Sequence, residues 1–107
     1  MLSDTEFQTL AQRTLTQLRD RYELAFENAE IEELELEPGI LTIVTATGKT
    51  FIVSAHSASK QVWLASPISG GLHFHWEECA QHWALKTGEL LDVVLRQELE
   101  REGVLVL

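Results

Sequence analysis

A chain of 107 residues, 45% of them hydrophobic, has room for one domain, and it can fold around a single core without metals or disulfides. Its formal net charge of −9 repels nucleic acid phosphates and anionic membranes and attracts cations or basic proteins. We therefore expect a single domain over residues 1–107, with neither a nucleic acid nor a membrane as its partner.

The acidic residues gather in the first third of the chain. Residues 1–39 hold ten acidic residues against three arginines, a local charge of −7, whereas residues 40–107 hold seven acidic and five basic residues. Crowding of like charges causes a repulsion that solubility alone does not require. We predict that this acidic third is the working surface of the protein.

The chain begins with the pattern of a capped helix. Ser3 and Glu6 have the spacing of a capping box, which satisfies two free backbone donors at a helix start. Apolar residues then recur at steps of three and four along one helix face. These residues are Phe7, Leu10, Ala11, Leu15, Leu18, Tyr22 and Ala25. The opposite face carries Asp20, Glu23 and Glu27, which are expected to point outward.

Short strands are expected after this helix. Residues 30–37 alternate with period two, and the phase slips once at Glu32 and Glu33, which indicates a bulge or a bend. Turn signals delimit the later strands. These strands are predicted over residues 40–46, 50–55, 61–65 and 72–76, with a candidate sixth around Trp83.

Helical spacing returns at Leu91, with Gly103 as the stop signal before a tail of residues 104–107. This order predicts an α+β fold, a two-layer α-β sandwich whose two terminal helices pack on one face of a five- to six-stranded antiparallel sheet. Strand alternation sends other side chains to the opposite, open face, where Trp63 is expected to be exposed. Trp76 and Trp83 are expected in the core. Also expected on the open face are Thr42, Val44, Ser54, His56, Gln61, His73 and His75.

Two stretches of the sequence carry a specific signature. They are Gln61-Val62-Trp63-Leu64-Ala65-Ser66-Pro67, and Ser69-Gly70-Gly71 followed by Phe74-His75-Trp76. This signature resembles that of the frataxin family, of the bacterial iron-sulfur type, and the likeness runs almost end to end. Further matching positions are Gly39 to Ile43, Gly48, Lys49, Trp83, Gly88, Leu91, Val94, Leu95, Glu98 and Leu99.

The resemblance implies a frataxin-like sandwich that binds Fe(2+) or Fe(3+) weakly through an acidic ridge on its first helix and first strand. It also implies docking on the cysteine desulfurase and the scaffold protein that build iron-sulfur clusters. By this likeness Gln61 and Trp63 belong to the partner-binding sheet surface, and His73 lies on the same predicted face. The acidic ridge, the implied metal site, consists of Asp20, Glu23, Glu30 and Glu32, with Glu27, Glu33 and Glu35 as extensions.

The chain departs from the family pattern at a few positions. Many members have asparagine, proline and aspartate where this chain has Ser54, Ala58 and His75. Arg19 and Phe26 occupy positions that are acidic in some bacterial relatives. These differences bear on the arrangement of the acidic ridge more than on the fold.

The chemistry of individual side chains leaves several alternatives open. Carboxylate oxygens suit Fe(II), Mn(II), Ca(II) and Mg(II) with little discrimination, so weak sites or a basic partner are both compatible with the acids. Three histidines, His56, His73 and His75, could lie together on the open face and bind Zn(II) or Fe(II). Cys79 is expected to be a partly buried, inert thiol.

No nucleophile elbow, phosphate loop, HExxH or CxxC pattern occurs in the sequence, so we expect no enzyme and no organic cofactor. The beginning of the chain lacks secretory and transit patterns, and the lone cysteine fits a reducing compartment, so we expect a cytoplasmic protein. The first hypothesis is a monomeric regulator, or iron chaperone, of iron-sulfur cluster assembly that metal can drive into oligomers. The alternatives are an acidic docking module with incidental iron binding, a metal carrier proper, and an iron oxidase or storage assembly.

Overall fold

The computed structural model describes residues 2–105 and has the predicted two-layer sandwich. Helix α1 (Asp4–Glu27) is followed by six strands and by helix α2 (Leu91–Arg101). The strands are β1 (Ile31–Glu37), β2 (Ile40–Thr45), β3 (Thr50–His56), β4 (Gln61–Ser66), β5 (Gly70–Glu77) and β6 (His82–Ala84). The predicted α+β fold is confirmed, and the candidate sixth strand around Trp83 is present.

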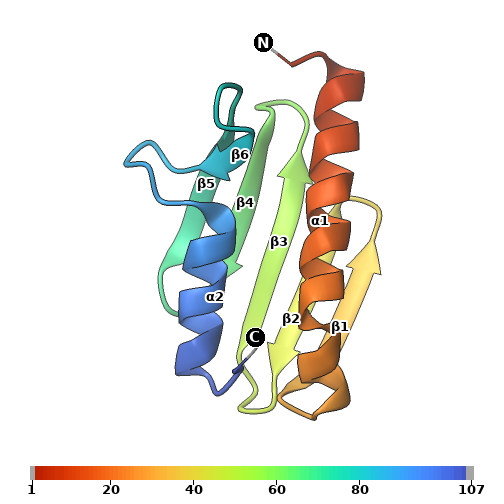
Figure 1. Ribbon diagram of the computed structural model, residues 1–107, viewed down its shortest axis with the longest axis vertical. Coiled ribbons are helices and arrows are strands. Elements are labelled where there is room, and N and C mark those ends of the chain that lie inside the picture. The colour runs from red at the N-terminus through yellow and green to blue at the C-terminus, as the bar shows by residue number, and fades with distance from the viewer. Residues whose placement is uncertain (1, 106–107) are drawn as a thin grey trace.

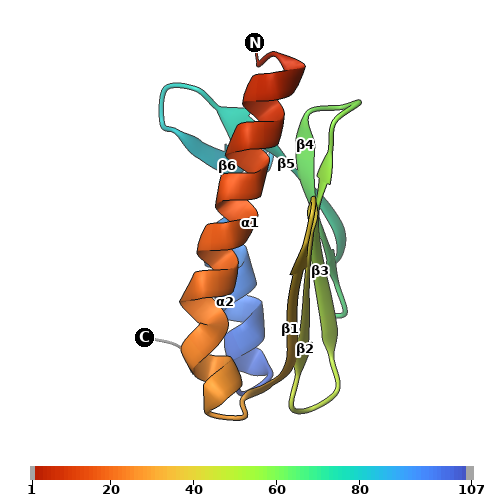
Figure 2. The same ribbon diagram turned by 90° about the vertical axis from the view of Figure 1, so that its right-hand side faces the viewer.

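The six strands pair in chain order, each antiparallel to the next, so β1 and β6 form the two edges of the sheet (Figure 1). Both helices cover the same face of the sheet, and its other face carries no helix (Figure 2). The short connections between consecutive strands fit this meander, because antiparallel neighbours need only tight turns. This arrangement leaves the predicted open face available to a partner.

Helix α1 begins with the predicted capping box. The Ser3 hydroxyl accepts a hydrogen bond from the Glu6 amide at 3.1 Å, and the Glu6 carboxylate accepts one from the Ser3 amide at 2.9 Å. The apolar face of the helix then packs on the sheet, while Leu10 is only partly buried at its margin. The fully enclosed residues of α1 are Phe7, Ala11, Leu15, Leu18, Tyr22 and Ala25.

Alternation along the central strands separates the core from the open face, as predicted. Leu41, Val53 and Leu64 are neighbours across β2, β3 and β4, and all three are completely buried beneath the helices. Trp83 joins this core, whereas Trp76 packs against it only half-buried. The core therefore lies entirely between the helices and one face of the sheet.

The strand boundaries differ from the prediction mainly at β5, which begins at Gly70 rather than at residue 72. Gly70 and Gly71 pair with Ser66 and Ala65, because the tight turn lets the ladder continue up to the turn residues. In the edge strand β1, the register shifts between Ile31 and Glu33, which confirms the predicted irregularity as a bulge. The bulge decides which side of β1 each acidic side chain faces.

The chain leaves α2 through Gly103, which adopts φ 86° as a left-handed helix stop. Val104 then returns to the core and is 1% exposed. The predicted tail of residues 104–107 is described only to residue 105; residues 106 and 107 lie outside the described part. Neither helix has the length and apolar character needed to cross a membrane.

Candidate functional site

The helical part of the acidic ridge lies on the outer surface of α1. Asp20, Glu23 and Glu27 are all exposed, and Glu27 is the last residue of the helix. Asp20 already has a cation beside it, because its carboxylate accepts a hydrogen bond from the Arg19 guanidinium at 2.8 Å. Glu23 and Glu27 stand one helical turn apart and are free to attract a cation.

Glu30 and Glu32 flank the start of β1 and have different environments. Glu30 is half-buried, and its carboxylate accepts a hydrogen bond from the Leu105 amide at 2.9 Å. Glu32 lies at the bulge and is exposed. Glu30 therefore has a structural partner at the end of the described chain, whereas Glu32 faces solvent.

The last two acids of the ridge face the other side of the molecule from α1. Glu33 pairs with Val44 and Glu35 pairs with Thr42, so both share the open face of the sheet. The acidic ridge is thus divided by the edge strand into a helical part and an open-face part. Within residues 2–105, no three acidic, histidine or cysteine side chains form a group that could enclose a metal ion.

Two of the three residues predicted to bind a partner, Trp63 and His73, form a stack of three rings with His56. The Trp63 indole lies between the imidazoles of His56 and His73, with ring centroids 3.5 Å and 4.1 Å away. The indole nitrogen of Trp63 donates a hydrogen bond to the Gln61 side chain at 2.9 Å. Trp63 faces the predicted side, but the prediction that it is exposed was wrong, because the two imidazoles cover it and leave it half-buried.

Within the described residues, the three histidines that could have lain together do not form a metal site. An indole separates His56 from His73, and the His75 imidazole hydrogen-bonds to the Glu77 carboxylate at 2.8 Å. Stacked imidazoles present ring faces to the indole, whereas metal coordination needs nitrogen lone pairs that converge. Among the described residues, the histidines therefore contribute stacking surface and hydrogen bonds.

The stack also changes the proton affinity of His56. Burial lowers the pKa of His56 below its ordinary value, and the nearby His73 lowers it further. The Ser54 hydroxyl hydrogen-bonds to the His56 ring at 2.9 Å. Because no carboxylate balances these two imidazoles in the stack, the neutral form of His56 is favoured.

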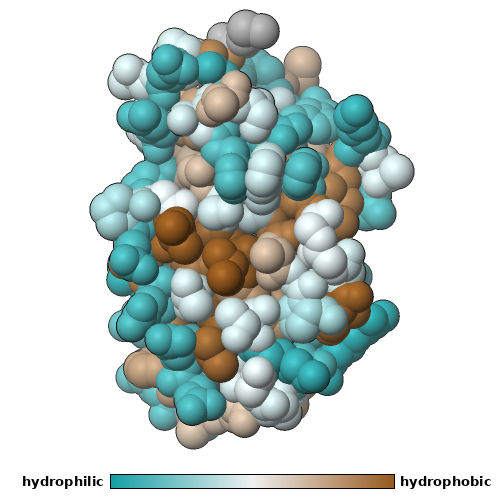
Figure 3. Space-filling view, turned by 180° about the vertical axis from the view of Figure 1, so that it is seen from behind, coloured by the Kyte–Doolittle hydropathy of each residue, from teal (hydrophilic) through white to brown (hydrophobic). Residues whose placement is uncertain are grey.

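The open face combines this stack with apolar side chains. Ile40 is 41% exposed, and Val44 and Ile52 are partly exposed on the same face. Figure 3 shows apolar residues gathered across the middle of this face and hydrophilic ones along its margins. Such a surface, an apolar centre with a charged rim, has the composition of a protein interface.

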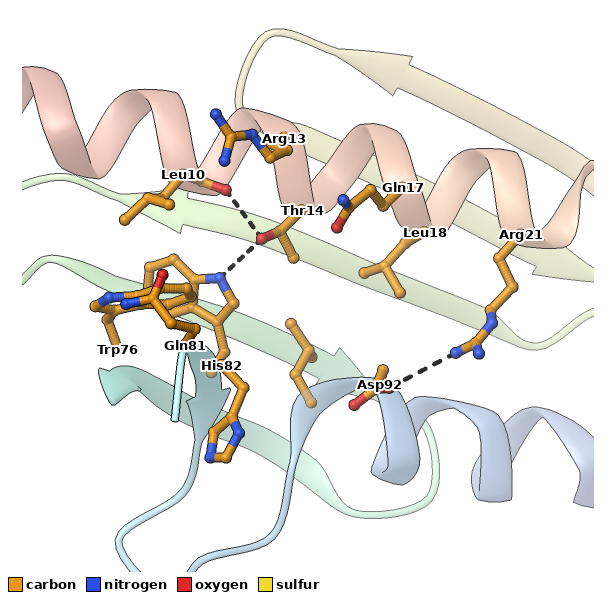
Figure 4. A pocket seen from close by; sticks show the side chains of 12 residues that line it. Leu10, Arg13, Thr14, Gln17, Leu18, Arg21, Trp76, Gln81, His82 and Asp92 are labelled. Carbon is orange, nitrogen blue, oxygen red and sulfur yellow. Dashed lines mark hydrogen bonds and ion pairs between the residues drawn. The ribbon is translucent and has the colours of Figure 1, made fainter. Parts of the chain in front are cut away.

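Away from the open face, a groove of about 540 Å³ lies between α1, β6 and the start of α2 (Figure 4). Two pairs of its polar groups are in contact: the Trp83 indole donates to the Thr14 hydroxyl at 2.8 Å, and Arg21 lies 3.7 Å from Asp92. The groove is lined by Leu10, Arg13, Thr14, Gln17, Leu18, Arg21, Trp76, Gln81, His82, Trp83, Leu91 and Asp92. These contacts join the two helices and the sheet edge, so we assign the groove a structural role.

Sequence reasoning missed two features of the surface. Cys79 is exposed, and the expectation of a partly buried thiol was wrong because Cys79 lies in the turn between β5 and β6. Phe26, 44% exposed, lines a small groove with Glu32 at the end of α1. The sequence signal that could have indicated this groove is the apolar residue Phe26 between the acidic residues of the helix.

Fold and site together define a small α-β sandwich with a divided carboxylate surface and an open sheet face suited to docking. The chain belongs to the frataxin family: the model of the Frataxin-like domain matches residues 1–103. Proteins of this family are generally iron-binding and take part in iron-sulfur cluster biogenesis; they are not classical enzymes.

Individual relatives agree with this assignment. The chain is 29% identical to mitochondrial frataxin of Arabidopsis thaliana over 94% of its own length and 55% of the relative's, so it spans about half of that protein. It is 30% identical to mitochondrial frataxin of Caenorhabditis elegans, covering 94% of this chain and 77% of the relative.

Two solved structures have the same fold. Frataxin from Psychromonas ingrahamii superposes with a TM-score of 0.79 at 20% identity, covering 98% of this chain and 96% of the other. The trimeric frataxin of Saccharomyces cerevisiae, complexed with ferrous iron, is 30% identical with a TM-score of 0.74 and covers 87% of this chain and 84% of the other. The sandwich is therefore shared across this family.

Proposed function

We propose that this chain is an iron-binding regulator of iron-sulfur cluster assembly that docks on a cysteine desulfurase and a scaffold protein. One row of cross-strand neighbours carries the proposal. Glu37, Ile40, Ser54 and Trp63 pair in succession across four strands, and His73 on β5 ends the row. The acidic edge and the stacked rings thus share one surface, which a single partner can contact.

The charges indicate what kind of partner fits. Glu33, Glu35 and Glu37 follow one another along the outer edge of this surface. Six carboxylates of the ridge are exposed, Glu33 and Glu35 on this surface and the others on α1 and at the bulge of β1. A basic patch on a desulfurase would meet the acids, while an apolar patch would meet Ile40 and the stack. Long-range attraction between opposite charges would speed the encounter and weaken as salt rises.

The test is binding to the cysteine desulfurase of the source cell, measured for paired amide variants at several salt concentrations. We expect E23Q/E27Q and E33Q/E35Q each to weaken binding about tenfold at low salt and to flatten its salt dependence. Trp63→Leu should also weaken binding about tenfold but leave the salt dependence unchanged.

The matched control is E89Q/E100Q, which removes the same number of charges from exposed positions outside the acidic ridge. This control should bind like the unchanged chain. Equal affinity and equal salt dependence for the ridge variants and the control would contradict the proposal.

Iron is, in this proposal, a weakly held cargo or signal. Exposed carboxylates spaced along a helix and a strand attract hard cations but do not surround one, so affinities of about 10 µM to 1 mM are expected. The chain would work in the cytoplasm, as a monomer that iron can assemble into oligomers. Sedimentation with and without Fe(II) tests this, and a stable oligomer in the absence of metal would contradict it.

A further inference from the structure

A small apolar groove lies beside the acidic surface, where α1 ends and β1 begins. Phe26 forms one wall and Ala46, in the turn between β2 and β3, forms another. The groove has a volume of about 410 Å³, and Ala29, Ile31 and Glu32 complete its lining. Four of its five lining residues are apolar, so it can receive an apolar side chain.

The Phe26 side chain is not needed to fill the hydrophobic core. Tyr22 and Ala25 already fill the inner face of this turn, with exposures of 0% and 3%, whereas Phe26 is 44% exposed. The backbone oxygen of Phe26 accepts a hydrogen bond from the Ala29 amide at 3.1 Å, which holds the two sides of the groove together. The groove is thus a fixed part of the helix end.

Acidic side chains surround this apolar site. Glu23 and Glu27 precede and follow Phe26 on α1, and Glu32 is part of the groove itself. Arg19, on the same helix, is paired with Asp20. A bound segment would therefore meet an apolar surface with negative charge around it.

We propose that this Phe26 groove is an anchor site for a partner protein, occupied by an apolar side chain flanked by lysine or arginine residues. A phenyl ring offers no ligand to a metal ion, so a groove built on it serves protein contact rather than iron binding. A half-exposed aromatic ring at the centre of a charged surface is the usual anchor of an interface, because binding completes its burial while charges orient the partner.

This inference rests on the proposed docking to a cysteine desulfurase, and the same binding assay tests it. We expect Phe26→Ala to weaken binding about tenfold with unchanged salt dependence, because an apolar contact is lost and no charge is altered. Phe26→Glu adds a negative charge and should weaken binding at least as much. If charge alone governed docking, Phe26→Glu would bind the basic partner more tightly.

Leu24→Ala is the matched control, since Leu24 is 59% exposed on the same helix and does not line the groove. It should bind like the unchanged chain, and all variants should unfold at nearly the same temperature. Phe26→Ala should also leave the Fe(II) titration of the acidic ridge unaltered.

The outcomes separate this inference from the proposed function. If the Glu→Gln variants of the acidic ridge bind more weakly but Phe26→Ala binds like Leu24→Ala, the Phe26 anchor is refuted and the docking proposal stands. If Phe26→Ala binds more weakly and the Glu→Gln variants do not, the anchor is supported and the acidic docking surface is refuted. Absence of any complex with the desulfurase overturns both.

Discussion

The imidazole of His56 lies nearly parallel to the indole of Trp63, with ring centroids 3.5 Å apart and an angle of 19° between the planes. His73 covers the other side of the same indole at 4.1 Å. The Trp63 indole on the open face is therefore held in one orientation by two imidazole rings. Protonation of either ring would add a positive charge to the open face of the sheet.

The first prediction concerns the pH dependence of stability. The pKa of His56 is lowered in the folded chain by burial and by His73, so the unfolded chain binds this proton more readily. The contribution of His56 to stability is complete above about pH 6.5 and is lost as the pH falls through its lowered pKa. The free energy of unfolding should thus fall less between about pH 7.5 and pH 5.5 in His56→Gln than in the unchanged chain.

His82→Gln serves as the comparison, because His82 lies on β6 and takes no part in the stack. Denaturant unfolding at each pH gives the free energy of unfolding as a function of pH for the unchanged chain, His56→Gln and His82→Gln. Parallel curves for the unchanged chain and His56→Gln would show that the stack does not shift this titration.

The second prediction concerns the groove of Figure 4. The Thr14 hydroxyl accepts a hydrogen bond from the Trp83 indole at 2.8 Å and donates one to the Leu10 carbonyl at 2.9 Å. Thr14→Val keeps the shape but leaves the indole N–H of a buried tryptophan without a partner, which should cost about 1–3 kcal/mol of unfolding free energy. Thr9→Val makes the same change at an exposed position of α1 and should cost far less. Equal losses would indicate that the hydrogen bond contributes nothing.

The third prediction concerns the phenol of Tyr22. This side chain is completely buried, and no group of the described residues hydrogen-bonds to its hydroxyl. Removing an unpaired buried hydroxyl relieves a desolvation cost, so Tyr22→Phe should leave the stability unchanged or raise it by up to about 1 kcal/mol. Denaturant unfolding checks this, and a clear loss of stability would point to a hydrogen-bonding partner such as an enclosed water molecule.

The same phenol gives an independent spectroscopic test. Burial raises the pKa of Tyr22 to about 12, and the chain has one tyrosine. Its contribution to stability is constant below about pH 10 and is lost as the pH rises from there towards 12. Ultraviolet absorbance should detect no tyrosinate in the folded chain at pH 10, whereas half-ionisation at that pH would mean that the ring is solvated.

The fourth prediction concerns iron on the divided ridge. Glu23 and Glu27 lie on α1, while Glu33 and Glu35 lie on the open face of β1. Titration with Fe(II), followed by backbone amide resonances, should perturb two separate groups of residues, and E33Q/E35Q should abolish only the effects on β1. A loss of both groups in this variant would mean that the acids act as one site.

Much of the fold follows from local patterns. The capping box at Ser3, the apolar steps along α1 and the turn signals before β2 and β3 are each read within a few residues, and each is confirmed. The bulge was also predictable, because alternation with period two breaks visibly at Glu32 and Glu33. Local hydrogen bonding and burial of one face leave little freedom at these positions.

The environment of Trp63 could not be read in this way. Alternation places Trp63 on the open face, but its cover depends on Ser54 and His73 being its cross-strand neighbours. That register depends on the turns and on core packing several strands away. The sequence therefore left open that the three histidines lie together, whereas the structure puts an indole between two of them.

The sequence by itself determined that the chain is acidic in its first third, begins with a capped amphipathic helix and forms a two-layer sandwich, because charge and periodicity are local properties. Only the tertiary structure decided how those acids are distributed. The bulge in β1 directs Glu33 and Glu35 to the open face while α1 packs on the opposite one. Two stretches of similar charge thus lie on different surfaces, because side-chain direction at an edge strand follows from register and packing, which no single residue encodes.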